Sequence, residues 1–343
     1  MSGGWNTIES DAGVFTYLLE NLGVKNVQFE ELLSLDPQAL AELSPVYGVI
    51  FLFKFPTNAP YVGEGGAPRD GQFDYDAAER LFFARQTIQN ACGTQALLSV
   101  LLNKTDDGGG TTSDTSVDVG AHLRTFREFA MALPPDLRGE ALSNDELIRD
   151  VHNSFAKSSP FVDETQRTAG ADDSEDVFHF IAYTAVNGRL YELDGLQPAP
   201  IDHGPCGGGG GDDDPLIFAE RALAAVQRRI ARYGAEEIHF NLLAAVRDRR
   251  LLARELGDGE LLAREARKRR AWQFENALRR HNFVGFAHEV LEGVVENHLR
   301  AGGPDGAAAY DKWVGDATAR FQRRIEEKQR RRRPEGEDVP MGE

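Results

Sequence analysis

The sequence F-H-F-I-A-Y-T-A-V-N-G-R-L-Y-E-L-D-G, residues 178–195, decides how this part of the chain folds. Two extended runs, 177–185 and 189–194, flank the dipeptide Asn187-Gly188. Asn-Gly between two such runs is the strongest short-range signal for a β-hairpin with a two-residue turn. We therefore predict an antiparallel hairpin whose strands meet at Asn187-Gly188.

This turn determines which side chains face each other across the hairpin. Val186 faces Arg189, and Ile181 faces Asp194. Because side chains alternate between the two faces of a strand, His179, Ile181 and Asp194 should project from one face. His179 and Asp194 are then diagonal neighbours, about 7–8 Å apart at the backbone and within side-chain reach. A carboxylate beside an imidazole fixes its tautomer and stabilises the imidazolium, as the third member of a catalytic triad does.

The same residues also have ordinary interpretations. His179 could be a partly buried strand histidine without a ligand, and Asp194-Gly195 could start a common turn. A slip of one residue in the strand register would place Asp194 on the opposite face and remove the pair.

A second informative stretch is A-C-G-T-Q-A-L-L-S-V-L-L at 91–102. It predicts a buried apolar helix that begins at Cys92. A helix N-terminus has unpaired N–H groups and a partial positive charge, and both favour thiolate over thiol. The same N–H groups can receive the oxyanion of a tetrahedral intermediate, and Gln86 could donate its side-chain amide there. Taken alone, Cys92 could equally be a small buried apolar residue, as most intracellular cysteines are. Cys92, His179 and Asp194 nevertheless follow the chain order of papain-like amidases.

The remaining chain mixes strand and helix signals. We expect buried strands at 47–53 and 237–246, and helices after Asp11, after Asp36-Pro37, after Ser143 and at 215–233. Residues 247–280 are charged and Pro-free, which predicts a long exposed helix interrupted near 257–259, followed by helices at 283–299 and 307–330. Polar or Gly-rich stretches at 106–116, 157–175 and 207–214 predict loops or disordered insertions.

Composition narrows the class of protein. The net charge is −17, but residues 248–343 hold 20 Lys and Arg against 18 Asp and Glu, so the acidic excess lies before them. An acidic first part disfavours nucleic acid and favours a basic partner. No apolar run approaches the roughly 20 residues of a membrane span, and no secretory signal is expected. Two cysteines fit a reducing compartment, so we expect the cytoplasm or the nucleus.

Cofactor and metal sites are not expected. Two cysteines cannot build a thiolate zinc site, and the Gly-rich tracts lack the Lys-Ser/Thr that follows a phosphate loop.

Four blocks of the sequence resemble the ubiquitin C-terminal hydrolases, a family of papain-like cysteine peptidases. They are W-N-T-I-E-S-D-A-G-V-F (5–15), F-F-A-R-Q-T-I-Q-N-A-C-G-T-Q-A-L-L-S-V-L-L-N (82–103), S-N-D-E-L-I-R-D-V-H-N-S-F-A (143–156) and the hairpin at 178–195. The resemblance implies an α/β (α+β) fold in which an antiparallel β-sheet is flanked by helices, papain-like at its centre and knotted. It implies a thiol hydrolase that cleaves after the C-terminal glycine of ubiquitin and acts on ubiquitin and ubiquitin conjugates.

Carried over position by position, the resemblance makes Cys92 the nucleophile and His179 the general base and then the acid. Asp194 orients His179, and Gln86 lines the oxyanion hole. Residues 157–175 match the family's crossover loop, which limits the size of the leaving group.

The segment A-W-Q-F-E-N-A-L-R-R-H-N-F-V-G-F-A-H-E-V-L, residues 271–291, resembles the helical extension of the proteasome-associated branch of this family. In that branch the extension binds a helical adaptor domain on a proteasomal ubiquitin receptor, which regulates activity. We therefore expect a catalytic domain at 1–246, a helical extension at 247–333 and a disordered tail at 334–343. The alternative is a ubiquitin-binding scaffold subunit whose hydrolase site is silent or only conditionally active.

Overall fold

The computed structural model of the protein describes residues 4–55, 66–88, 90–105, 116–155, 177–207, 214–234, 237–301 and 303–332. The chain divides by its internal contacts into two compact units, of which the first ends at His281 and the second begins at Asn282. Predictions for 157–175 and the tail at 334–343 fall outside the described residues, as do most of 106–116 and 207–214.

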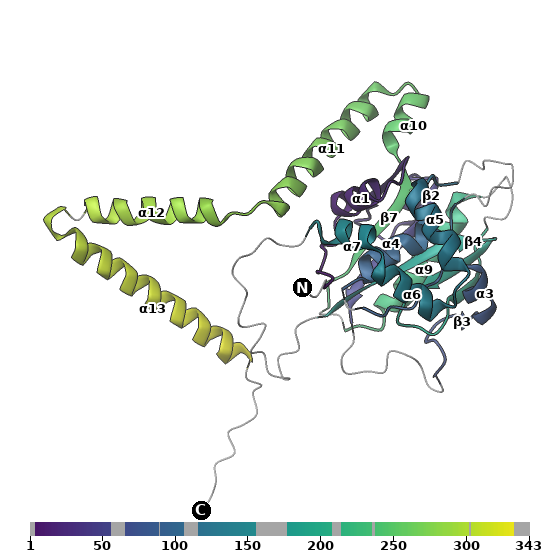
Figure 1. The fold of residues 1–343 in the computed structure, drawn as a ribbon, viewed down its shortest axis with the longest axis horizontal. Coiled ribbons are helices and arrows are strands. Elements are labelled where there is room, and N and C mark those ends of the chain that lie inside the picture. The colour runs from purple at the N-terminus through teal and green to yellow at the C-terminus, as the bar shows by residue number, and fades with distance from the viewer. Residues whose placement is uncertain are drawn as a thin grey trace, which may run out of the picture. The chain divides into compact units, whose positions relative to one another are not determined.

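A seven-stranded antiparallel sheet forms the centre of the first unit (Figure 1). Its strands are β1 (Val27–Glu31), β2 (Val46–Lys54), β3 (Gln72–Phe73), β4 (Phe178–Val186), β5 (Arg189–Leu193), β6 (Ile201–Pro205) and β7 (Asn241–Arg247). They lie in the order β1-β7-β2-β4-β5-β6-β3, so neighbouring strands are often distant in the sequence. The expected strand at 237–246 exists as β7, although it begins only at Asn241.

The predicted hairpin is confirmed as β4 and β5. Val186 pairs with Arg189, and Ala182 pairs with Leu193. Asn187 and Gly188 both have positive φ, 51° and 76°, as the two-residue turn requires. The register is therefore the one that places His179 and Asp194 diagonally across the two strands.

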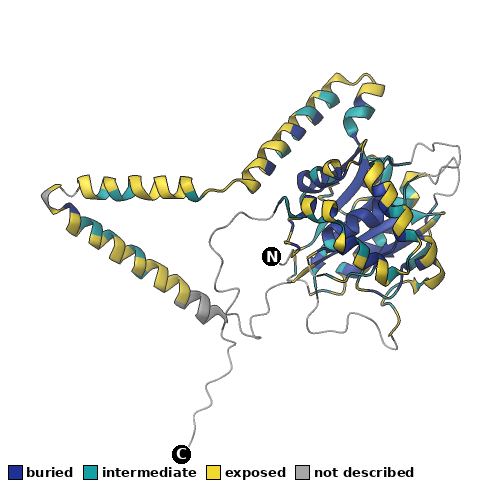
Figure 2. Ribbon diagram, in the orientation of Figure 1, coloured by how far each residue is buried: buried dark blue, intermediate teal, exposed yellow. Residues whose placement is uncertain are grey.

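Helices cover both faces of the sheet. In β4, Phe180 and Ala182 join one core cluster, whereas Ile181 and Tyr183 join another on the opposite face. Residues of α1 (Ala12–Asn21), α4 (Cys92–Leu101) and α5 (Gly120–Met131) contribute to the first cluster. Residues of α2 (Pro37–Ala41) and α9 (Pro215–Ile230) complete the second. Figure 2 shows the buried residues gathered around this sheet.

Most helix starts agree with the sequence. Asp11 caps α1 by accepting a hydrogen bond from Val14 N, and Asp36 caps α2 with Pro37 at its first position. The predicted start at Ser143 is wrong, because Ser143 lies inside α6 (Pro135–Asn144). Asp145 instead caps α7 (Glu146–Asn153), because it directly precedes the helix and its side chain accepts a hydrogen bond from Ile148 N. The short α3 (Tyr75–Arg80) is capped by Asp74.

The charged segment after β7 forms α10 (Arg249–Glu255) and α11 (Gly259–Arg280), with the predicted interruption at Gly257, whose φ is +66°. Both helices lie after residue 246, where the helical extension was expected to begin. Both nevertheless belong to the first compact unit. The Trp272 ring lies against Gly13 of α1, and Asn276 donates a hydrogen bond to the Gly13 carbonyl oxygen at 3.0 Å.

The second unit contains α12 (Val284–Ala301) and α13 (Gly306–Arg332), which contact each other. His298 of α12 stacks on Trp313 of α13 with ring centroids 4.8 Å apart. No residue of α12 is buried, and Phe286, Leu291 and Phe321 are all exposed. Within the described part of the chain, no helix is both long and apolar enough to cross a membrane.

Candidate active site

His179 and Asp194 meet at one edge of the β4–β5 hairpin. The imidazole Nε2 donates a hydrogen bond to Asp194 Oδ1 at 2.7 Å, and the two residues are 3% and 1% exposed. His179 stands near the start of β4 beside Phe53 of β2, its backbone partner. The hairpin turn thus brings the two side chains into contact although the residues are 15 positions apart in the sequence.

The surroundings of His179 favour its charged form. Burial alone would lower the pKa of His179, but the Asp194 carboxylate outweighs it and raises that pKa to about 9. The Cys92 side chain also hydrogen-bonds to His179 and adds to the rise. The rings of Phe53 and Phe55 lie edge-on to the imidazole, with centroids 5.8 and 5.9 Å away. The site therefore favours His179 as an imidazolium.

Asp194 is held by its own turn. Its Oδ1 also accepts a hydrogen bond from Leu196 N at 3.0 Å, and its carbonyl oxygen accepts one from Gln197 N at 2.9 Å. The bond from Leu196 N holds the carboxylate, and the bond from Gln197 N holds the backbone of the turn. Asp194 is therefore built to orient the imidazole.

Cys92 is the first residue of α4, as the sequence predicts. Ala91, the residue before it, makes no side-chain cap, and the first bond of the helix is from Gln95 N to Ala91 O at 2.9 Å. The N–H groups of the first turn are therefore available to an anion beside the cysteine sulfur. Cys92 is partly exposed, so a substrate can reach it.

Gln86 lies in the extended segment before Cys92. Its Nε2 donates one hydrogen to the Ile88 carbonyl oxygen at 3.0 Å, which leaves the second amide hydrogen for another acceptor. Its Oε1 is buried without a hydrogen-bond partner among the described residues. The structure thus leaves donor capacity at Gln86, as an oxyanion hole needs.

Arg138 supports this segment in a way that the sequence does not signal. The residue is 2% exposed, and its guanidinium donates to backbone carbonyl oxygens, including those of Ala78, Leu81 and Phe83. Gly139 follows it at a site where a Cβ would lie 1.8 Å from the Arg85 carbonyl oxygen. Helix α6 therefore holds the chain that leads to Gln86.

A buried charge network lies next to Phe53, the strand neighbour of His179. Glu192 of β5 binds Arg229 of α9 and accepts a hydrogen bond from His203 Nε2 at 3.1 Å. Burial would raise the pKa of Glu192, but Arg229 and then His203 lower it. The Arg229 guanidinium also lies over the Phe53 ring, 4.8 Å from its centroid. Sequence spacing gave no signal for this network because its members come from separate elements.

Cys206 and His152, which the proposed reaction does not use, are both buried. Cys206 is buried, and neither it nor Cys92 forms a disulfide. His152 accepts from Thr94 Oγ1 at 2.8 Å and donates to the Asn6 carbonyl oxygen at 2.6 Å. Burial lowers the pKa of His152 to about 4, so it is neutral near pH 7. Among the described residues, no group of three or more His, Cys, Asp and Glu is placed to hold a metal ion.

Comparisons with known proteins agree with the fold. The family model of ubiquitin carboxyl-terminal hydrolase, family 1, matches residues 5–231, and a second model, of ubiquitin carboxyl-terminal hydrolases, matches 259–299. Ubiquitin carboxyl-terminal hydrolase 2 of Schizosaccharomyces pombe is 48% identical over 301 residues, covering 86% of this chain and 92% of the relative. Ubiquitin carboxyl-terminal hydrolase ubh-4 of Caenorhabditis elegans is 36% identical over 327 residues, covering 88% and 93%.

Solved structures give the same result. Trichinella spiralis UCH37 bound to ubiquitin vinyl methyl ester is similar with a TM-score of 0.56 at 32% identity, covering 80% of this chain and 99% of that chain. Its catalytic domain bound to the same compound matches with a TM-score of 0.56 at 35% identity, covering 72% and 97%. The chain belongs to ubiquitin carboxyl-terminal hydrolase family 1, the cysteine-type deubiquitinating hydrolases.

Proposed function

We propose that this hydrolase cleaves the bond after the C-terminal glycine of ubiquitin, with Cys92 as nucleophile. The observation that carries this proposal is the hydrogen bond from His179 to Asp194 at 2.7 Å, with the Cys92 side chain bonded to the same imidazole. Ubiquitin as the substrate is supported by the relatives and by the similar structures that hold ubiquitin vinyl methyl ester.

The reaction follows from this arrangement. The Cys92 thiolate attacks the glycine carbonyl carbon, and the oxyanion receives hydrogen bonds from the Cys92 N–H and the Gln86 amide. His179 then gives its proton to the leaving amine, which departs and leaves a thioester. Water attacks the thioester while His179 removes its proton, and ubiquitin leaves with a free carboxylate as the Cys92 thiolate forms again. Asp194 keeps the imidazole oriented through both steps.

Turnover of a ubiquitin C-terminal amide by the full chain tests this proposal. Cys92→Ser should abolish release of the amine, because a serine hydroxyl is far less acidic than a thiol. Cys206→Ser is the matched control and should keep wild-type turnover, since Cys206 is the only other cysteine. Full turnover by Cys92→Ser would contradict the proposal. Ubiquitin binding without turnover by the wild type would favour a scaffold with a silent site.

We further propose that the second unit binds a helical adaptor domain of a proteasomal ubiquitin receptor, so that the enzyme acts at proteasomes of the cytoplasm and nucleus. The second family model, of ubiquitin carboxyl-terminal hydrolases, matches residues 259–299. Helix α12 exposes Phe286 and Val290 one turn apart. An apolar face on a helix without buried residues suits a groove or a helix of a partner. Adaptor docking would then regulate the activity of the first unit.

Co-purification of the full chain with proteasomes tests the adaptor proposal. Phe286→Asp together with Val290→Asp should remove co-purification, because both changes place charge on the proposed apolar contact. His288→Asp is the control, since it places an aspartate at an exposed polar position of α12. Co-purification that survives the double change would contradict the proposal, and ubiquitin turnover with and without the adaptor reports regulation.

A further inference from the structure

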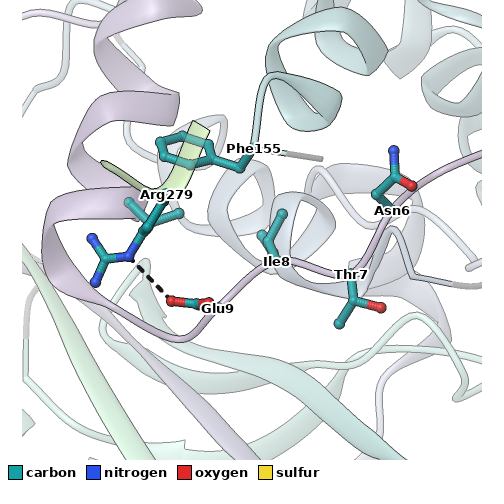
Figure 3. A pocket seen from close by; sticks show the side chains of 7 residues that line it. Asn6, Thr7, Ile8, Glu9, Phe155 and Arg279 are labelled. Atoms are coloured by element: carbon teal, nitrogen blue, oxygen red, sulfur yellow. Dashed lines mark hydrogen bonds and ion pairs between the residues drawn. The ribbon is translucent and has the colours of Figure 1, made fainter. Parts of the chain in front are cut away.

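A pocket of about 470 Å³ lies between the N-terminal segment and helix α11 (Figure 3). It is lined by Asn6, Thr7, Ile8, Glu9, Val14, Phe155 and Arg279. Six of these residues precede the hairpin, and Arg279 comes from near the end of α11. The extension following β7 therefore contributes directly to a pocket of the first unit.

Ile8, which lines this pocket, lies against the residue that follows the candidate nucleophile. A Cβ on Gly93, the residue after Cys92, would lie 2.7 Å from Ile8 Cδ1. Asn90 Nδ2 also donates to the Trp5 carbonyl oxygen at 3.1 Å. The segment that lines the pocket thus contacts residues on both sides of Cys92.

Segment 5–9 has no helix or strand of its own and depends on its neighbours for its shape. Asn153 and His152 hold it at Asn6. Within the described residues, the backbone groups of Thr7 and Ile8 make no hydrogen bond to other backbone groups. Backbone N–H and C=O groups without a backbone partner suit an extended peptide as their ligand.

Arg279 holds the other end of this segment. Its Nε donates to Glu9 Oε2 at 3.1 Å (Figure 3). Its Nη2 donates to Asp11 Oδ2 at 3.0 Å. Its Nη1 donates to Asn276 Oδ1 at 2.9 Å, so all three guanidinium nitrogens have an acceptor. The other oxygen of Asp11 caps α1 through Val14 N at 2.9 Å. One side chain of α11 therefore binds both acidic residues on either side of Ser10.

The next residue, Arg280, contacts Phe155, which also lines the pocket. Its guanidinium lies over the rings of Tyr17 and Phe155, 4.6 and 5.7 Å from their centroids, and bonds to Tyr17 Oη at 2.6 Å. Trp272 seats the same helix against Gly13. The C-terminal half of α11 thus braces the pocket from two sides.

We propose that Arg279 is a positioning residue for substrate binding: by holding Glu9 and Asp11, it keeps segment 6–9 in the shape that accepts the extended C-terminal tail of ubiquitin beside Cys92. This inference rests on the proposed function for the identity of the tail. Arg279 acts through Glu9 and Asp11 and takes no part in the bond changes. The helical extension therefore sets substrate affinity even without a partner.

Steady-state kinetics of the full chain on a ubiquitin C-terminal amide test the inference. Arg279→Gln should raise KM about threefold to tenfold, the effect of losing two partly exposed ion pairs, with kcat little changed. Arg279→Lys should recover part of the affinity, because it keeps the charge without the forked geometry. Arg270→Gln is the control, since Arg270 is an exposed arginine of the same helix.

A double variant separates positioning from direct contact. If Arg279 acts through Glu9, the combination of Arg279→Gln with Glu9→Gln should raise KM by less than the product of the two single effects. Multiplicative effects, an unchanged KM or a lowered KM in Arg279→Gln would overturn the inference. Absence of turnover by the wild type would instead overturn the proposed function, so the two failures are distinguishable.

Discussion

The backbone N–H of Gln86 donates a hydrogen bond to the carbonyl oxygen of Gly195 at 2.8 Å. Gln86 is the candidate oxyanion donor, and Gly195 follows the carboxylate that orients His179. This one bond joins the two halves of the candidate site, which come from the segment before α4 and from the end of the hairpin. The distance between oxyanion donor and base is thus set by backbone contact.

Gly195 should tolerate no side chain. A Cβ there would lie 2.1 Å from Gln95 Nε2 and 2.9 Å from Gln86 N, so the Gly195→Ala protein must move one of them. We expect about 1–3 kcal/mol lower free energy of unfolding in urea, together with lower kcat. Gly234→Ala is the control, because nothing lies within 4 Å of that Cβ position. Equal stability and kcat in the two variants would show that Gln86 and Gly195 are not closely apposed.

Gln86→Ala should lower kcat on a ubiquitin amide by about 10²- to 10³-fold, the usual cost of removing one oxyanion donor. KM should change little, since the donor acts on charge that develops only in the transition state. Gln38→Ala, at an exposed glutamine of α2, is the control and should leave both constants unchanged. A Gln86→Ala protein with wild-type kcat would exclude this residue from the oxyanion hole.

Asp194→Asn should lower kcat by about 10²- to 10⁴-fold, because the imidazole loses its orienting acceptor and general acid–base transfer fails. The measurement is turnover beside a folded-state check by circular dichroism. Adduct formation with a small thiol reagent should also slow at neutral pH, since the imidazolium that stabilises the thiolate is weakened. A variant that keeps wild-type kcat would mean that Asp194 serves the turn alone.

The raised pKa of His179 has a consequence for stability. The unfolded histidine has a pKa of about 6.5, whereas Asp194 holds that of the folded residue at about 9. Between these values the folded protein binds more protons, so this contribution is full below about pH 6.5 and is lost as the pH rises to about 9. Urea unfolding across this window should show falling stability in the wild type and a flatter profile in Asp194→Asn. Identical profiles would contradict the ion pair.

Local signals explain how much of this fold the sequence predicts. Asn187-Gly188 specifies its turn through positive φ at both residues, and the register of His179 and Asp194 follows from it. The start of α4 at Cys92 is also local, because an apolar run and its flanking residues define a helix. The expected helix start at Ser143 is wrong because Ser143 and Glu146 have the spacing of a capping box, whereas Asp145 caps α7 without a Glu or Gln three residues later.

Long-range partners could not be predicted in this way. Arg138 bonds to carbonyl oxygens of residues about sixty positions earlier in the chain, and Arg229 meets Glu192 across the sheet. Their partners are decided by the packing of separate elements, which leaves no spacing pattern. Arg279 was visible only as part of the segment R-R-H-N-F, and its acceptors Glu9 and Asp11 lie some 270 residues away. The catalytic roles of Cys92, Gln86 and Asp194 are predictions that the experiments above test directly.

The most direct test of the central claim is intact-mass analysis after the full chain is incubated with ubiquitin bearing a C-terminal vinyl methyl ester. The account predicts one covalent adduct per chain, mapped to Cys92 by peptide mass spectrometry, formed by Cys206→Ser and lost in Cys92→Ala. An adduct that persists in Cys92→Ala, or none in the wild type with or without proteasomes, would contradict Cys92 as a nucleophile acting on ubiquitin.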